Sequence, residues 1–102
     1  MRIIFIRTLR EFWQRHADAQ SPLTDWFKAT EAARWRNFMD LRQTFGSADT
    51  AKVGSGNTVT IFDIGGNKYR LIAAVHYNAG VVYALMVMTH KEYDTIKWKA
   101  QL

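Results

Sequence analysis

The strongest constraint on the fold comes from three apolar runs in the C-terminal half of the chain. The runs are TVTIFDI, KYRLIAAVHY and VVYALMVM, at residues 58–64, 68–77 and 81–88. They are rich in β-branched and aromatic residues, and short stretches with glycine and asparagine at 65–67 and 78–80 separate them. That pattern is typical of strands joined by tight turns. The sequence therefore predicts an antiparallel meander of three strands.

The N-terminal half shows helical spacing after one short strand. Residues 2–6, RIIFI, are β-branched and aromatic and predict a buried strand. Apolar positions then recur at helical spacing from Leu9, and we expect this first helix to end near His16. The stretch SPLTDWF at 21–27 predicts the start of a second helix, and a break near 33–37 separates it from a third.

Capping residues indicate where several of these elements begin and end. Ser21 and Pro22 suit the N-cap and the first helical position of the second helix, and Gly46 suits the end of the third. Residues 47–58, SADTAKVGSGNT, are small and polar and predict a loop. The stretch THKE at 89–92 has the spacing of a capping box, so we expect a short C-terminal helix. This order of elements predicts an α+β domain, with the helices packed on one face of the sheet.

Composition limits the kinds of function. A chain of 102 residues predicts one domain, residues 1–102. Because there are no cysteines and only three scattered histidines, we expect no metal site, and no cofactor-binding motif is present either. The apolar run at residues 3–6 is too short for a signal peptide or a membrane span, so we expect a cytoplasmic protein without a membrane partner. The net charge of +5 suggests a polyanion or an acidic protein partner, and a solvated basic surface is the alternative.

Strand register brings two polar stretches together at one end of the sheet. Counting back from the second turn puts Arg70 opposite residue 88 or 89, and it places residues 67–68 beside residues 90–91. Candidate side chains gathered there are those of Asn67, Lys68, Arg70, His90, Lys91 and Tyr93. Most are donors or cations, so phosphate is their natural ligand, and imidazole and phenol can move protons. Such a site could cleave RNA through its own 2′-hydroxyl, with no metal and no protein nucleophile.

The same residues have structural explanations. Arg70, which we expect at the surface, could simply pair with Asp63 on the neighbouring strand. His90 could be a solvated helix residue, Tyr93 a packing residue, and Glu92 the partner in the capping box. The residues alone therefore leave a phosphate site and a plain helix cap as even alternatives.

Two stretches, FDIGGNKYRLIAAVHY and VMTHKEYD, together resemble the HigB family of toxins, the mRNA-cleaving members of bacterial type II toxin–antitoxin pairs. The N-terminal half is similar to that family as well, with its strand, its first helix and its Trp-bearing second helix, so the resemblance covers essentially the whole chain. The resemblance implies a RelE-like α+β fold. It also implies an endoribonuclease that needs no metal or cofactor, cleaves mRNA on the translating ribosome and so inhibits translation.

The resemblance further implies partners and site residues. The expected inhibitor is a HigA-type helix-turn-helix antitoxin encoded alongside the toxin, and operator DNA would be contacted only through that antitoxin. By motif, Asn67 and Arg70 match the G-N-x-x-R turn-and-strand box. His90, Tyr93 and Asp94 match the T-H-x-E-Y-D box at the helix start.

Roles for these residues follow from their chemistry. Arg70 is expected to stabilise the charge that grows on the phosphate, and His90 or Tyr93 to move protons. The residues expected to hold RNA are Asn67, Lys68, Lys91 and Lys52. Two other functions remain open: a basic RNA- or ribosome-binding module that blocks translation without cutting, and a structural domain whose basic face a partner covers.

Overall fold

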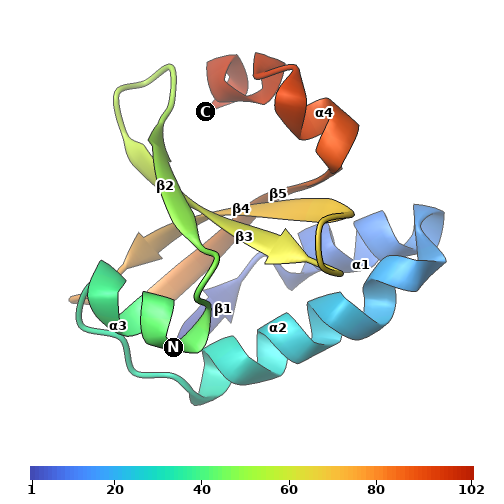
Figure 1. Ribbon diagram of the computed structural model, residues 1–102. Coiled ribbons are helices and arrows are strands. Elements are labelled where there is room, and N and C mark those ends of the chain that lie inside the picture. The colour runs from blue at the N-terminus through green and yellow to red at the C-terminus, as the bar shows by residue number, and fades with distance from the viewer.

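The computed structural model describes residues 1–102, with the three N-terminal helices on one side of a twisted five-stranded sheet and the short C-terminal helices on the other (Figure 1). The elements are β1 (Arg2–Ile4), α1 (Ile6–Arg15), the 3₁₀ turn η1 (Ala17–Ala19), α2 (Gln20–Ala32), α3 (Phe38–Thr44), β2 (Asp49–Lys52), β3 (Thr58–Ile64), β4 (Tyr69–His76), β5 (Val81–Thr89), α4 (His90–Asp94) and the 3₁₀ helix η2 (Lys97–Gln101). The strand order is β1-β5-β4-β3-β2; β1 runs parallel to β5, and the other pairs are antiparallel. The predicted α+β class is confirmed.

Strands β3, β4 and β5 form the predicted meander, with ends within about one residue of the sequence prediction. Gly65 and Gly66 have φ values of 64° and 71° in the first turn, and Gly80 has 68° in the second. These left-handed conformations favour glycine, which explains its place in both turns. The register pairs Arg70 with Met88, as predicted.

One predicted loop is partly wrong. Residues 49–52 form β2, which pairs antiparallel with β3 at the edge of the sheet. Ala51 lies opposite Val59, and both belong with the apolar residues on one face of the sheet. Only small or polar residues surround Ala51 in sequence, so pairing with β3, rather than local propensity, explains this strand.

The helices follow the predicted spacing with some changes at their ends. Helix α1 ends at Arg15 with His16 as its C-cap, and the break between α2 and α3 spans residues 33–37, as predicted. The predictions of Ser21 as N-cap and Pro22 as first helical residue are wrong, because η1 leads directly into α2, which begins at Gln20. β1 stops at Ile4, because Phe5 adopts a left-handed conformation that turns the chain into α1.

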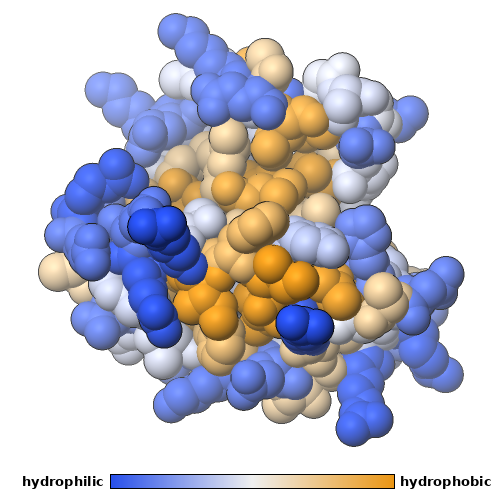
Figure 2. Space-filling model, turned by 180° about the vertical axis from the view of Figure 1, so that it is seen from behind, coloured by the Kyte–Doolittle hydropathy of each residue, from blue (hydrophilic) through white to orange (hydrophobic).

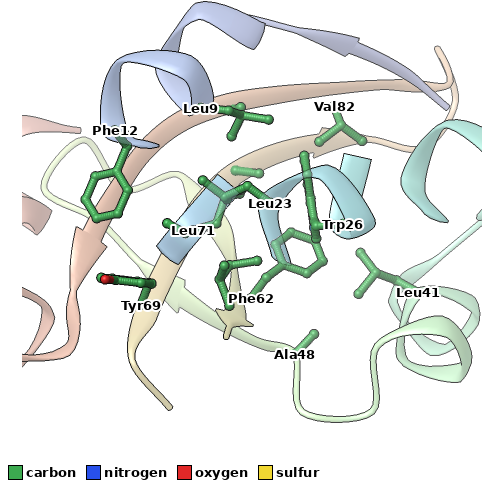
Figure 3. Packing of buried hydrophobic residues seen from close by; sticks show 14 of the residues in the cluster. Leu9, Phe12, Leu23, Trp26, Leu41, Ala48, Phe62, Tyr69, Leu71 and Val82 are labelled. Carbon is green, nitrogen blue, oxygen red and sulfur yellow. The ribbon is translucent and has the colours of Figure 1, made fainter. Parts of the chain in front are cut away.

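The main core fills the space between the helices and the sheet (Figure 3). Leu23 and Trp26 from α2 meet Phe62 and Leu71 from the sheet, and the rings of Trp26 and Phe62 lie edge to face at 5.4 Å. A second, smaller cluster lies on the opposite face, where Trp98 packs with residues such as Ile72 and Met88. The C-terminal segment therefore covers part of the face that α1, α2 and α3 leave open, and α4 is held against that face (Figure 1).

Candidate active site

The two predicted polar stretches meet where β5 runs into α4. The predicted capping box is confirmed: Thr89 Oγ1 accepts a hydrogen bond from the Glu92 amide at 3.1 Å, and Glu92 Oε1 accepts one from the Thr89 amide at 3.1 Å. The His90 amide donates to the Lys68 carbonyl at 3.0 Å. This bond ties the start of α4 to the turn before β4, so the residues of both stretches become neighbours.

Arg70 lies inside this junction, and the prediction that it is at the surface is wrong. Its side chain is only 9% exposed, because the ring of Tyr93 covers it, with the Cζ atom 5.5 Å from the ring centroid. Its Nε atom lies 3.1 Å from Asp63 Oδ1, and its Nη2 donates to Asn67 Oδ1 at 2.6 Å. Nη1 donates to the Tyr69 carbonyl at 3.1 Å. The pairing with Asp63, the structural explanation for Arg70, is thus present.

Tyr93 connects Arg70 to the C-terminal segment. Its ring stacks on that of Trp98, with centroids 5.5 Å apart and an interplanar angle of 19°. The Trp98 indole Nε1 donates to the Tyr93 carbonyl at 3.0 Å. Burial raises the pKa of the Tyr93 phenol above its usual 10.0, and the Arg70 cation opposes that rise without cancelling it. At neutral pH the phenol is therefore protonated and suited to donate a proton.

His90 forms a pair with Asp94 one helical turn later. The His90 Nε2 atom lies 3.1 Å from Asp94 Oδ2. The His90 side chain is 42% exposed, yet its Nδ1 atom is buried and has no hydrogen-bond partner in the protein. An external molecule can therefore reach the ring only at Nε2, where it competes with Asp94. The sequence interpretation gave Asp94 no role beyond the motif, although the i, i+4 spacing signalled this pair.

The predicted lysines lie at different distances from this junction. Lys91 is exposed on α4, next to His90, and makes no ion pair. Lys68 is exposed in the turn, and its Nζ lies 3.3 Å from Asp18 Oδ2. Lys52 lies on β2 opposite Thr58, at the other end of β3 from Asp63, so the structure does not bring it to the other predicted residues.

Asp18 holds the turn from the helix side of the sheet. Besides its pairing with Lys68, it accepts a hydrogen bond from the Tyr69 hydroxyl. The Tyr69 hydrogen bond is the main cause that lowers the pKa of the Asp18 carboxyl below 3.8, and Asp18 in turn raises the pKa of Tyr69. The turn that carries Asn67 is thus anchored on both faces of the sheet. Sequence reasoning missed Asp18, because its partners lie about 50 residues away and no local pattern connects them.

Two further features concern metal ligands and membrane-spanning helices. The structure contains no group of three or more His, Cys, Asp or Glu side chains that could hold a metal ion. None of its helices has the length and the hydropathy needed to cross a membrane.

Comparison with known proteins agrees with this architecture. Residues 19–96 match the family model for HigB_toxin, the RelE-like toxic component of a toxin–antitoxin system. The mRNA interferase toxin HigB of Escherichia coli K12 is 28% identical over 94 residues, which are 92% of this chain and 88% of that protein. The mRNA interferases HigB of Escherichia coli O157:H7 and Shigella flexneri match to the same extent. Because the family model spans most of the sequence, the chain belongs to the HigB toxin family, the RelE-like toxins of toxin–antitoxin systems.

Proposed function

We propose that the protein is an endoribonuclease that cleaves mRNA on the translating ribosome in the cytoplasm, without a metal ion or cofactor. The observation that carries this proposal is the junction at Thr89, where Arg70, Tyr93 and the His90–Asp94 pair converge around one helix start. The relatives named mRNA interferase support the choice of substrate. The proposed inhibitor is a HigA-type helix-turn-helix antitoxin, and operator DNA is reached only through it.

The proposed reaction uses the 2′-hydroxyl of the RNA as nucleophile. Its oxygen forms a bond to the adjacent phosphorus, the bond from phosphorus to the 5′-oxygen breaks, and a 2′,3′-cyclic phosphate results. The hydroxyl proton must leave, and the departing 5′-oxygen must gain a proton. Two groups that exchange protons and one cation near the phosphate are sufficient for this chemistry.

Tyr93 and His90 are the proposed proton donor and acceptor. The raised pKa of Tyr93 keeps its phenol protonated, which suits donation to the 5′-oxygen. His90 is proposed to take the proton of the 2′-hydroxyl at Nε2, which requires an unprotonated Nε2, so the 2′-hydroxyl must replace Asp94 Oδ2 as its partner when RNA binds. Once protonated, Nε2 donates to Asp94, whose carboxylate stabilises the imidazolium.

Arg70 is proposed to act through its charge rather than through two hydrogen bonds to the phosphate. All three of its nitrogens already bond to protein oxygens, so it offers few free N–H groups. A cation in a low-dielectric setting nevertheless stabilises nearby negative charge more than one in water. Asn67 is proposed to keep Arg70 in place and to shape the turn.

Lysines are proposed to hold the RNA backbone. Lys91 and Lys68 lie next to the junction and are exposed. Lys52 is separated from Asp63 by the length of β3 between Thr58 and Asp63, about 17 Å at the usual rise along a strand. Lys52 would therefore contact nucleotides some way from the cleaved bond.

Mapping of 5′ ends on a translated message tests the proposal. Brief expression of the wild type should produce codon-dependent cuts, and these should disappear in the double variant His90→Ala, Tyr93→Phe. The variant His76→Ala, Tyr83→Phe is a matched control, because both residues lie on strands away from α4. Inhibited translation without new 5′ ends would favour the basic RNA- or ribosome-binding module instead.

A further inference from the structure

Strand β5 has an edge that no other strand covers. β1 pairs with β5 only from Arg2, opposite Val81, to Ile4, opposite Tyr83. β5 continues to Thr89, and its pairing on that stretch is with β4 alone. The left-handed Phe5 ends β1 early, so residues 85–88 form a free edge beside its end.

The register identifies which backbone groups face this edge. The His90 amide donates to Lys68 on the β4 side, and hydrogen-bonding direction alternates along a strand. Val87 therefore turns its N–H and C=O away from β4, toward the open edge. The Thr89 amide, which faces the same way, already bonds to Glu92. Val87 thus presents an unpaired donor and acceptor, and open edges of this kind tend to pair with another chain.

A cavity of about 320 Å³ lies along the same stretch. Met86, Met88 and Trp98 supply its apolar lining, Val87 also borders it, and Lys97 and other polar side chains of the C-terminal segment complete the wall. In Figure 1 β1 and β5 lie at the rear, and Figure 2 views the molecule from there. Apolar side chains gather across the middle of that side, with hydrophilic ones around them (Figure 2).

One free cation borders the edge, and the nearby carboxylates already have partners. Glu11 on α1 pairs with Arg7 at 3.1 Å, and Glu92 on α4 is used in the capping box. Lys97 on η2 borders the cavity, is exposed and makes no ion pair. A partner at this edge therefore meets a cation, Lys97, whose charge it can neutralise.

We propose that an extended, acidic segment of the antitoxin binds along residues 85–88 and adds a strand to the sheet, in line with β1. Its backbone bonds to the N–H and C=O of Val87, one apolar side chain enters the cavity, and a carboxylate faces Lys97 on η2. Strand addition of this kind takes affinity from main-chain bonds and specificity from side-chain pockets. An RNA strand would match the charge but not the free peptide edge, so the observations favour a protein segment.

This surface lies apart from His90 on α4. Glu92 and Thr95 border the cavity, and successive residues of an α-helix are 100° apart, so His90 and Asp94 lie on the other side of the helix. The proposal rests on membership in the toxin–antitoxin family and not on cleavage of RNA. Antitoxin binding and ribonuclease activity are therefore tested by separate measurements.

Titration with the purified cognate antitoxin, the product of the gene paired with this toxin, tests the surface. Met86→Glu places a carboxylate in the cavity and should weaken binding by at least tenfold. Met39→Glu is the matched control, because Met39 is 76% exposed on α3, and binding should stay within twofold of wild type. Lys97→Glu, an exposed change that spares the fold, should weaken binding several-fold, and more so at low salt. Unchanged affinity in Lys97→Glu and Met86→Glu would overturn the proposal.

Hydrogen exchange of the wild-type toxin gives a second readout that needs no substitution. The antitoxin should slow exchange of the Val87 amide, and unchanged exchange there would refute strand addition. Sedimentation of the toxin alone tests whether a second copy of the chain occupies the edge. A wild-type dimer that Met86→Glu disrupts would assign the edge to that second copy and overturn the proposal. If Met86→Glu abolishes ribosome binding and leaves antitoxin binding intact, the edge belongs to RNA and the proposal fails.

Discussion

The guanidinium of Arg70 and the carboxylate of Asp63 face each other across β3 and β4, with Nε and Oδ1 3.1 Å apart. The pair is largely shielded from water on the Arg70 side, because Tyr93 lies over the guanidinium. Removing one partner of such a partly buried pair destabilises the fold, because the group left behind is shielded from water and has lost its hydrogen-bond partner. Arg70 is therefore both part of the candidate site and part of what holds α4 against the sheet.

Arg70→Ala should destabilise the protein. The change leaves Asp63 and the Asn67 carboxamide without their partner and removes the surface on which Tyr93 packs. We expect the free energy of unfolding to fall by about 1–3 kcal/mol, measured by urea denaturation. Arg34→Ala, at an exposed position between α2 and α3, is the control and should change stability by less than about 0.5 kcal/mol. Equal stability of Arg70→Ala and wild type would contradict the shielded pair.

Local patterns predicted most of the sheet, because glycine turns and β-branched runs leave few alternatives there. They also predicted the capping box and the meeting of 67–68 with 90–91, since hairpin register follows from the turns. They did not predict β2, whose sequence has little strand propensity and which forms only because β3 offers a partner.

Burial at the site could not be predicted, because it depends on contacts between distant segments. Arg70 is shielded by a tyrosine from α4, and that tyrosine is held by Trp98 from the chain's last residues. Asp18 reaches Tyr69 from the opposite face of the sheet. None of these contacts leaves a periodic signal in the sequence, whereas the His90–Asp94 pair does, through its i, i+4 spacing.

Tyr93→Phe should separate the role of the Tyr93 hydroxyl in cleavage from the role of the ring in packing. The ring and its stack on Trp98 remain, so the free energy of unfolding should change by less than about 0.5 kcal/mol, while cleavage should be lost. Because burial raises the phenol's pKa above 10.0, the wild-type rate should show no loss from phenol ionisation up to pH 9. Cleavage assays with thermal unfolding measure both effects. Wild-type cleavage in Tyr93→Phe would exclude Tyr93 as the proton donor.

Asp94→Asn should slow cleavage without unfolding the protein. Asp94 is exposed and bonds only to His90, so its loss removes the partner that stabilises a protonated Nε2. His90→Ala should lower the single-turnover rate by about 10²–10⁴-fold, the usual worth of a proton-transfer group, and Asp94→Asn by a smaller factor. Asp25→Asn, an exposed carboxylate on α2, is the control. If Asp94→Asn still slows cleavage when His90 is already Ala, Asp94 does not act through His90.

Asp18→Asn should remove a contribution to the free energy of unfolding that depends on pH. The folded state lowers the pKa of Asp18 below 3.8, so the ionised carboxylate stabilises the fold above the unfolded-state pKa. That contribution disappears as the pH falls through the lower, folded-state pKa. The urea midpoint of wild type should therefore exceed that of Asp18→Asn by its largest amount at pH 6, and this difference should shrink below pH 3.8. Tyr69→Phe, which removes the main hydrogen bond to Asp18, should largely abolish the pH dependence of that difference. A difference that stays constant down to pH 2 would mean that Asp18 holds the turn by shape alone and not by its charge.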